Sequence, residues 1–435
     1  MKQREFKKRR QALMQRIGKG NIAIIASASS AVRNRDVHYP FRQDSDFYYL
    51  TGFNEADALA VFIPGRQQGE YVLFCREFDA TKALWEGAHA GLEGATSQYG
   101  ADDAFPIDDL DEILPGMLEN KAKVFYPMGK NGELDHKLLD WINHIRKQSR
   151  TGVTAPGELV SLEHIVHEMR LFKSAEEIKL MRRAAEISAQ AHVRAMQYCQ
   201  PGVHEFEVEA ELIHHFMRSG LRAVAYPSIV AGGKNACVLH YTENADKLRK
   251  GDLLLIDAGA ECDHYAADIT RTFPVSGKFS EPQRLLYQLV LDAQEAALAE
   301  IAPGIAWNKA HEASVEVLTK GLVELGLLKG RVKKLIKDEK YKQFYMHRIG
   351  HWLGMDVHDV GDYKIKDEWR LLEPGMVLTV EPGLYVAADC ETVDKQWRGI
   401  GIRIEDDVLV TADGYEVLTA AVPKTIEAIE SVMRS

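Results

Sequence analysis

Short apolar runs alternate with helical patterns over the first third of this 435-residue chain. Runs at 21–27, 58–64 and 70–75 have the length and composition of buried strands, and 137–147 has the period of an amphipathic helix. Strands that alternate with helices indicate an α/β domain. Residues 1–20 predict a first helix with one apolar side and a solvated basic face.

The pattern changes at 154–159, where a Pro-Gly pair interrupts it, and we place a domain boundary at residue 160. Ser174 and Glu177 then form a predicted capping box at the start of a long helix. Further helices are predicted at 205–219, 281–301 and 308–326, and strands at 251–259, 264–273, 376–383 and 401–410, the last entering an Asp-Gly hairpin. Strands that gather after helices predict an α+β second domain with an antiparallel or mixed sheet.

Composition narrows the classes of partner. The chain has 54 Lys and Arg against 64 Asp and Glu, a net charge of −10, which argues against a nucleic-acid partner. No apolar run reaches the roughly 18 residues of a membrane span, so we expect no membrane partner. Its 5 cysteines are scattered and form no C-x-x-C pair, which favours a reducing compartment, and we expect a cytoplasmic protein.

Four acidic residues occur in segments that otherwise have the pattern of buried strands. Asp257 belongs to a strand whose two faces are both apolar, so the pattern predicts that its carboxylate is buried. Asp268, Glu381 and Glu405 take similar places in the three later strands. An ionised carboxylate is costly to bury without compensation, so the four must be protonated, paired or bound to cations.

Each carboxylate alone has a simpler explanation, which is an exposed strand end or an ion pair with arginine. Arg403 and Arg271 would neutralise two of the four and leave two without a partner. Three histidines, His347, His351 and His358, lie within twelve residues among several glycines. The first two have the i, i+4 spacing of one helix face, but the glycines argue against a regular helix.

Taken together, the acidic residues and the histidine cluster predict a metal site. Two divalent cations carry four positive charges, which balance four carboxylates, and a neutral histidine completes the ligand set. Ligands that are mostly oxygen favour Mn²⁺, with Co²⁺ and Zn²⁺ as alternatives. Two such ions activate water at neutral pH and polarise a carbonyl group.

Five sequence blocks resemble the aminopeptidase P (Xaa-Pro aminopeptidase) branch of the pita-bread metallopeptidases: LLLIDAG, YAADITRTFPVSGKF, HWLGMDVHDVG, VLTVEPGLY and GIRIEDD. HEMRLFKSAEEI and YPFRQDSDFYYLTGFNEADA extend the resemblance over most of the chain. It implies a smaller α/β N-terminal aminopeptidase P domain at 1–160. A pita-bread catalytic domain at 161–435 would follow, with a curved, mainly antiparallel sheet flanked by helices. The fold class is therefore α+β.

Carried over position by position, the resemblance implies five metal ligands. Asp257 would serve one ion, His351 and Glu381 the other, and Asp268 and Glu405 would bridge the two. A metal-bridging hydroxide would attack the carbonyl of the Xaa-Pro bond, with Glu381 as the proton shuttle.

The resemblance also implies roles for residues around the metals. His240, His347 and His358 would hold the substrate and act in catalysis, with His240 and His358 stabilising the tetrahedral intermediate. Arg403 and Tyr385 would orient the ligands or one end of the substrate.

Two further positions bear on the pocket and on assembly. Arg348 stands where many relatives have a small residue, so we expect the substrate pocket near His347 to differ from theirs. Asp36 resembles a position that reaches a neighbouring subunit in oligomeric relatives, although an exposed turn residue is the simpler interpretation. Kinship favours a homo-oligomer, either a dimer or a tetramer.

The activity implied is release of the N-terminal residue from peptides that carry proline in second position. Prolidase, which cleaves only Xaa-Pro dipeptides, is the alternative within the same class, and the N-terminal block favours the aminopeptidase. A non-catalytic pita-bread protein that binds peptides is the alternative from another class. Such proteins lose metal ligands, and all five ligand positions are intact here.

Overall fold

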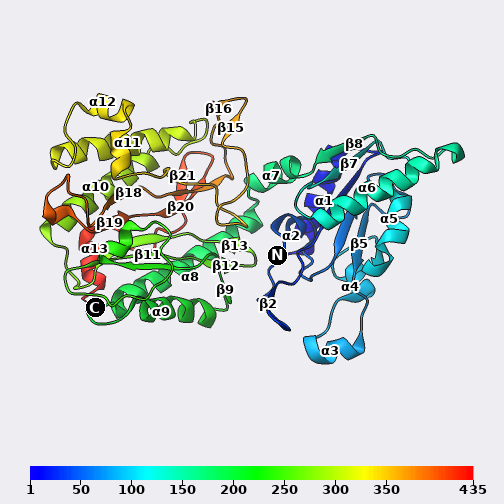
Figure 1. The fold of residues 1–435 in the computed structure, drawn as a ribbon, viewed down its shortest axis with the longest axis horizontal. Coiled ribbons are helices and arrows are strands. Elements are labelled where there is room, and N and C mark those ends of the chain that lie inside the picture. The colour runs from blue at the N-terminus through cyan, green and yellow to red at the C-terminus, as the bar shows by residue number, and fades with distance from the viewer. Residues whose placement is uncertain (435) are drawn as a thin grey trace. The chain divides into compact units, whose positions relative to one another are not determined.

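The computed structural model describes residues 1–434 and divides into two compact units, Met1–Arg170 and a second that begins at Leu171 (Figure 1). The boundary predicted at residue 160 falls within strand β8 (Glu158–Ser161), and helix α7 (Glu163–Leu171) follows it. Over residues 1–434, no helix combines the length and the apolar character that a membrane crossing requires.

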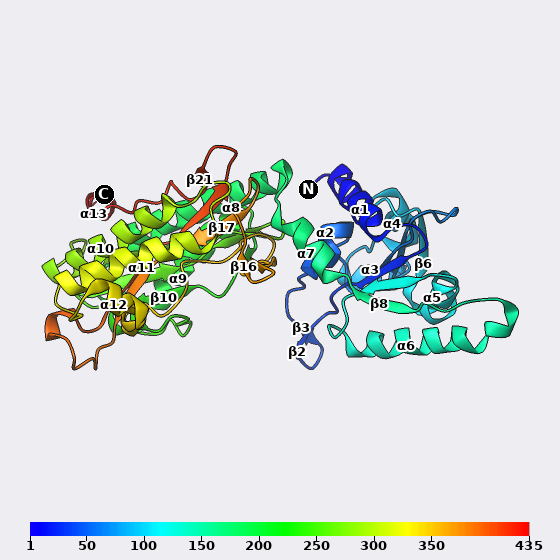
Figure 2. The same cartoon turned by 90° about the horizontal axis from the view of Figure 1, so that it is seen from above.

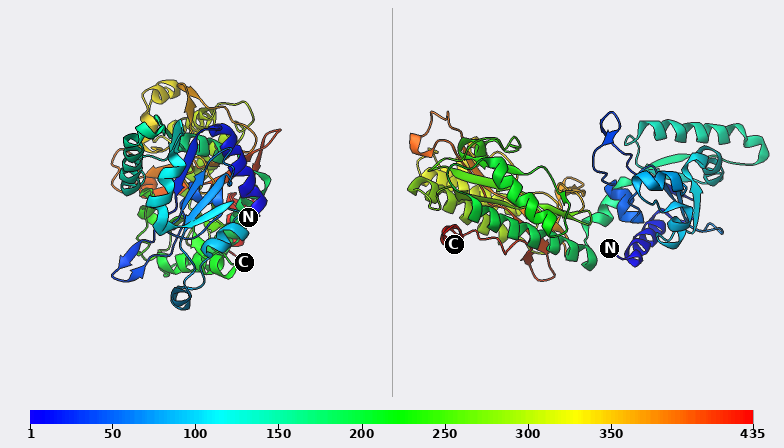
Figure 3. Two further views of the ribbon diagram at one scale, coloured as in Figure 1. Left: turned by 90° about the vertical axis from the view of Figure 1, so that its right-hand side faces the viewer. Right: turned by 90° about the horizontal axis from the view of Figure 1, so that it is seen from below.

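The first unit is built on a mixed six-stranded sheet. Its strands are β1 (Ile22–Ala26), β4 (Leu59–Phe62), β5 (Tyr71–Cys75), β6 (Asp103–Pro106), β7 (Lys123–Tyr126) and β8. They lie in the order β6–β5–β4–β1–β7–β8, with β4 antiparallel to both neighbours and the other pairs parallel. The helices are α1 (Gln3–Ile17), α2 (Ser45–Thr51), α3 (Ala80–Glu86), α4 (Gly91–Ser97), α5 (Leu110–Leu118) and α6 (Gly132–Lys147). Figures 2 and 3 show α1 and α6 on opposite sides of the sheet, which confirms the α/β interpretation.

Helix α1 buries its apolar side as predicted, but the prediction of a solvated basic face is wrong for Arg9 and Arg10. Their guanidinium groups donate hydrogen bonds to the carbonyls of Tyr49 and Leu50, each at 3.1 Å. Each guanidinium also lies over an aromatic ring. An arginine tolerates burial when its N–H groups find acceptors and its flat face stacks on a ring.

The second unit places antiparallel strands between pairs of helices. Its helices are α8 (Ala175–Tyr198), α9 (Glu205–Arg218), α10 (Glu281–Leu298), α11 (Asn308–Glu324), α12 (Val332–Lys337) and α13 (Ile426–Val432). The strands nearest the site are β10 (Ile229–Gly232), β11 (Leu253–Asp257), β13 (Tyr265–Ala266), β14 (Thr270–Pro274), β17 (Val377–Val380), β18 (Gly383–Val386), β19 (Ile400–Arg403), β20 (Asp406–Val410) and β21 (Tyr415–Val417). Figure 1 shows them between the α8/α9 pair and the α10/α11 pair. This architecture confirms the α+β fold class.

Local predictions hold well in this unit. Ser174 and Glu177 form the predicted capping box at the start of α8, and each satisfies a backbone N–H that the first helical turn leaves free. Strands β20 and β21 form the predicted hairpin, with Val410 opposite Tyr415. All pairs of the β10–β11–β14 and β17–β20–β21 sheets are antiparallel.

Three predicted strands are each divided in two, which corrects the sequence analysis. The segment 264–273 becomes β13 and β14, 376–383 runs from β17 into the start of β18, and 401–410 becomes β19 and β20. At each division the chain leaves one partner strand and joins another, for example from β18 at β19 to β17 at β20. Apolar alternation continues across such a change of partner, so the pattern does not reveal it.

A fully buried ion pair joins Arg271 of β14 to Asp406 of β20. The two side chains are 0% exposed, with Nη2 of Arg271 2.7 Å from Oδ1 of Asp406. Burial raises the pKa of Asp406, but the charges of Arg271 and Lys424 outweigh it and bring that pKa to about 2.

We expect Arg271→Met to lower the free energy of unfolding by about 3–5 kcal/mol, because it leaves a buried carboxylate without its main partner. Arg182→Met is the control, because Arg182 pairs with Glu416 at the surface, where the side chains are 50% and 40% exposed. Its loss should be about 1 kcal/mol or less. Urea unfolding measures both, and equal losses would contradict a stabilising role for the buried pair.

Candidate metal centre

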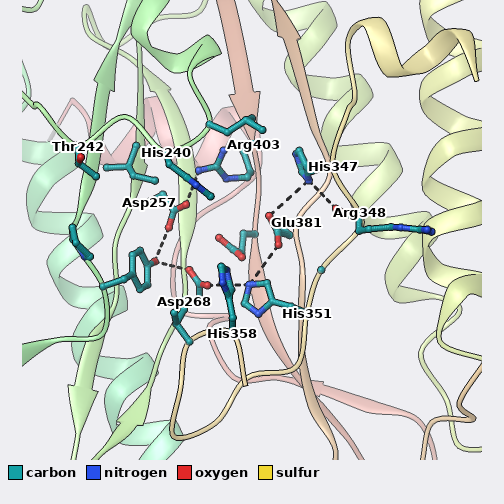
Figure 4. Close-up of a pocket in the computed structure, with 17 residues that line it drawn as sticks. His240, Thr242, Asp257, Asp268, His347, Arg348, His351, His358, Glu381 and Arg403 are labelled. Carbon is teal, nitrogen blue, oxygen red and sulfur yellow. Dashed lines mark hydrogen bonds and ion pairs between the residues drawn. The ribbon is translucent and has the colours of Figure 1, made fainter. Parts of the chain in front are cut away.

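The second unit contains a pocket of about 540 Å³ where the predicted site residues meet (Figure 4). Residues from several separate chain segments line it: Asp257, Asp268, His351, Glu381, Glu405, His240, His347, His358, Arg348 and Arg403. Tyr385 lies behind this wall, 2% exposed. Residues predicted from scattered motifs therefore occupy one place in the structure.

The four acidic residues lie at strand ends. Asp257 is the last residue of β11, whereas Asp268, Glu381 and Glu405 occupy the breaks between consecutive strands. Antiparallel pairing places Asp257 opposite Thr270, and the backbone N–H of Glu405 donates to the carbonyl of Thr270 at 3.0 Å. These backbone contacts direct side chains that are far apart in sequence toward a single point.

The segment that carries His351 is held against β17 by backbone contacts. The N–H of Glu381 donates to the carbonyl of Ile349 at 2.7 Å, and the N–H of Thr379 donates to the carbonyl of His351 at 2.9 Å. A Cβ at Gly350 would lie 2.0 Å from the carbonyl oxygen of Thr379, so this approach requires glycine. The glycine that argued against a helix therefore brings the imidazole up to the carboxylates.

The donor atoms are close enough to share a cation. Ligand atoms of Asp268, His351 and Glu405 all lie within 4.8 Å of one another. Nε2 of His351 is 3.4 Å from Oδ2 of Asp268 and 3.6 Å from Oε1 of Glu381. Three of the five predicted ligands thus form one candidate metal site, and Glu381 adjoins it.

Tyr226 is a site residue that the sequence analysis missed. Its hydroxyl lies 2.6 Å from Oδ1 of Asp257 and 2.5 Å from Oδ1 of Asp268. Tyr226 therefore links Asp257, the remaining predicted ligand, to Asp268. Burial, with the two carboxylates beside it, raises the pKa of Tyr226 well above its usual value. A single tyrosine ahead of a proline has no ligand spacing, so nothing in the pattern marked it.

The carboxylates resist full ionisation when no cation balances them. Burial raises the pKa of Asp257 and, far more, that of Glu405, and repulsion from Asp268 adds to both effects. Burial also brings the pKa of Glu381 to about 7, although His351 and Arg403 oppose it.

At Asp268 and His351 the pKa shifts instead favour the charged form of each side chain. Burial raises the pKa of Asp268, but hydrogen bonds from His351 and Tyr226 outweigh it, and the net pKa lies below the ordinary value. Burial lowers the pKa of His351, but Asp268 and Glu381 outweigh that effect and bring it to about 9. A proton held by His351 thus occupies the place where a cation would bind.

Within residues 1–434, Arg403 is the one arginine that neutralises a carboxylate of this cluster. Nη2 of Arg403 lies 2.5 Å from Oδ2 of Asp257, as the ion-pair alternative allowed. The companion expectation, that Arg271 would neutralise another of the four, is wrong, because Arg271 pairs with Asp406 outside the pocket. The remaining oxygen donors and one imidazole fit divalent cations of hard or borderline character.

Arg403 also orders the ligands beside it. Its Nε donates to Oγ1 of Thr270 at 3.0 Å, and that hydroxyl donates to Oε2 of Glu405 at 2.6 Å. Nη1 of Arg403 donates to the hydroxyl of Tyr385 at 3.0 Å. The guanidinium thereby fixes Asp257 and, through the threonine, Glu405.

The three histidines predicted to contact the substrate, His240, His347 and His358, differ in how firmly they are held. Nδ1 of His347 donates to the carbonyl of Arg348 at 2.7 Å, and its Nε2 accepts from the Tyr385 hydroxyl at 2.9 Å. Burial and the charge of Arg403 lower the pKa of His347 to about 3, so the ring is neutral. His240 and His358 are exposed and line the pocket, where they are open to an incoming ligand.

Asp36 lies in the first unit, in the turn between β2 (Val32–Asn34) and β3 (Val37–His38), and is exposed. The pocket lies entirely in the second unit, so Asp36 does not line it. Its predicted reach to a neighbouring subunit stays a prediction.

Comparisons with protein families, with relatives and with solved structures all match this chain to aminopeptidases of one metallopeptidase family. Residues 179–412 match metallopeptidase family M24, and residues 6–126 match the aminopeptidase P N-terminal domain. The chain is 47% identical to Xaa-Pro aminopeptidase of Escherichia coli over 430 residues, which covers 99% of this chain and 97% of that protein. An aminopeptidase structure from Pseudomonas aeruginosa is 57% identical with a TM-score of 0.99, covering 100% of this chain and 98% of that one. Zinc-substituted E. coli aminopeptidase P in complex with product is 46% identical with a TM-score of 0.97, with the same coverage.

Asp268→Ala is expected to abolish Mn²⁺ binding, because Asp268 contacts His351 and, through Tyr226, Asp257. Isothermal titration with MnCl₂ measures the binding, and thermal unfolding checks that both units stay folded. Asp292→Ala, an exposed change on α10, is the control and should bind metal as the parent chain does. Undiminished Mn²⁺ binding by the Asp268 variant would show that the metal lies elsewhere.

Proposed function

The chain belongs to metallopeptidase family M24, in its aminopeptidase P branch, and we propose that the pocket around Asp268 and His351 is its active site. The chain is a metal-dependent Xaa-Pro aminopeptidase that releases the N-terminal residue from peptides with proline in second position. One observation carries the assignment of the site. Four carboxylates and an imidazole converge at the base of a pocket that histidines also line.

The metal ligands of the proposal are Asp257, Asp268, His351, Glu381 and Glu405. Asp257 would hold one ion, His351 and Glu381 the other, and Asp268 and Glu405 would contact both. Divalent cations bound there supply activation of a water molecule and polarisation of the scissile carbonyl. We favour Mn²⁺, with Co²⁺ and Zn²⁺ as alternatives, because oxygen donors dominate the set.

Glu381 is the carboxylate best placed to move a proton. Its Oε1 faces His351, and its Oε2 lies 3.9 Å from Nδ1 of His347, at the pocket wall. It would take a proton from the attacking water and return it to the departing proline nitrogen. That nitrogen belongs to a tertiary amide and has no N–H, so it must gain a proton to leave as an amine.

The exposed histidines supply hydrogen-bond donors for the developing oxyanion. His358 stands beside His351, with ring centroids 4.4 Å apart, and burial with the charge of His351 lowers its pKa. A neutral imidazole still carries one N–H, which it would donate to the oxyanion. His240 approaches from another chain segment, in the view of Figure 4.

His358→Ala should lower kcat by about 10²–10³ with little change in metal content, because it removes an oxyanion donor and no ligand. Steady-state kinetics and metal analysis of the same preparation measure both quantities. His214→Ala, a change at a histidine of α9 that does not line the pocket, is the control. A variant that loses metal along with activity would place His358 among the ligands instead.

The relatives and the N-terminal domain favour the aminopeptidase over a dipeptidase. With metal removed and Mn²⁺ then restored, we expect hydrolysis of Xaa-Pro-Xaa tripeptides to be lost and regained. Product analysis by mass spectrometry should show release of the single N-terminal residue. Cleavage of Xaa-Pro dipeptides alone would establish a prolidase, and binding without turnover would establish the non-catalytic alternative.

We further propose a homo-oligomer, a dimer or a tetramer, that works in the cytoplasm. Trp85 and Leu84 of α3 are 86% and 85% exposed, and adjacent large apolar side chains at a surface favour an interface. All five cysteines are free, which suits a reducing compartment. Multi-angle light scattering tests the assembly, and cell fractionation tests the location.

A further inference from the structure

Arg348 is a cation on the pocket wall that the proposed reaction does not use. Its side chain is exposed and lines the pocket. Within residues 1–434, no carboxylate lies at ion-pair distance from its guanidinium, which instead lies 5.5 Å from the ring centroid of Trp369. An arginine without an acidic partner at the edge of a binding pocket is available to a ligand.

The backbone around Arg348 is held in a fixed place relative to the carboxylates. The His347 ring donates to the carbonyl of Arg348, and the next residue, Ile349, accepts the backbone N–H of Glu381. Figure 4 shows the Arg348 side chain extending away from the carboxylate cluster. The cation therefore does not compete with metal ions for the carboxylates.

The direction of the substrate chain follows from the proposed function, on which this inference rests. An aminopeptidase accepts one residue before the scissile bond, and everything after the proline has to leave through the open side of the pocket. Successive residues of an extended peptide advance by roughly 3.3–3.6 Å each. The groups just beyond the proline thus reach the pocket edge, where an exposed side chain such as Arg348 meets them.

We propose that Arg348 is a specificity-determining residue that favours substrates with a carboxylate on the residue that follows the proline. That carboxylate is either the free C-terminus of a tripeptide or an acidic side chain in third position. A guanidinium matches a carboxylate with two parallel hydrogen bonds, and the Trp369 ring lies within cation–π distance of this one. Because the pair is solvent-exposed, the preference is about two- to fivefold in kcat/KM and weakens with salt.

Four peptides separate the two sources of the carboxylate. Ala-Pro-Ala is compared with its C-terminal amide, and Ala-Pro-Asp-amide with Ala-Pro-Asn-amide, all on the Mn²⁺-loaded enzyme at low ionic strength. The parent enzyme should prefer the charged member of a pair by about two- to fivefold. Arg348→Gln should bring that ratio close to one while the amides are hydrolysed as before, and Arg348→Lys should keep part of it.

Lys364→Gln is the matched control. Nζ of Lys364 lies 4.6 Å from the same Trp369 ring, but Lys364 does not line the pocket. Its removal should leave the charged-to-neutral ratio unchanged. An Arg348→Gln variant that keeps the preference, or that slows charged and neutral peptides in equal proportion, overturns the inference. A parent enzyme that hydrolyses none of the four peptides overturns the proposed function, and this inference with it.

Discussion

The burial of several like charges at one point is the constraint that shapes the second unit. Without cations, burial and repulsion hold the pKa of Asp257, Glu381 and Glu405 above their ordinary values. One arginine, Arg403, pairs with one of these carboxylates, and no other arginine does so among the residues described. The fold therefore gathers more carboxylates in one pocket than its own cations neutralise, and bound divalent cations would favour the ionised form of these carboxylates.

Three successive acidic residues, 405–407, have different partners and different roles. Glu405 faces the candidate metal centre, Asp406 pairs with Arg271 on the other side, and Asp407 accepts the backbone N–H of Asp268 at 3.1 Å. This alternation follows the two-residue period of extended chain. Glu405 and Asp407 thus both act on the metal side, one through a ligand atom and the other by holding the backbone of a second ligand.

The pocket combines a rigid base with an open edge. Hydrogen bonds hold His347, Tyr385 and Arg403 in one chain of donors and acceptors, whereas His240 and His358 stay exposed to an incoming peptide. Such an arrangement suits a reaction in which the N-terminal residue and proline must be positioned and the rest of the peptide left free. Arg348 lies at this edge and is not one of the proposed ligands, so differences in substrate preference are expected to arise there rather than at the ligands.

The sequence by itself determined the class of both units, the bounds of the long helices to within a few residues, and the carboxylates that could not be buried without compensation. Periodicity and capping are local, so α8 and the hairpin of β20 and β21 could be predicted from neighbouring residues alone. Tertiary structure decided where the predicted strands divide, which arginine meets which carboxylate, and that Tyr226 joins Asp257 to Asp268. These features depend on pairing between segments far apart in the chain. The pattern of apolar and polar residues within one segment does not indicate which other segment it will contact.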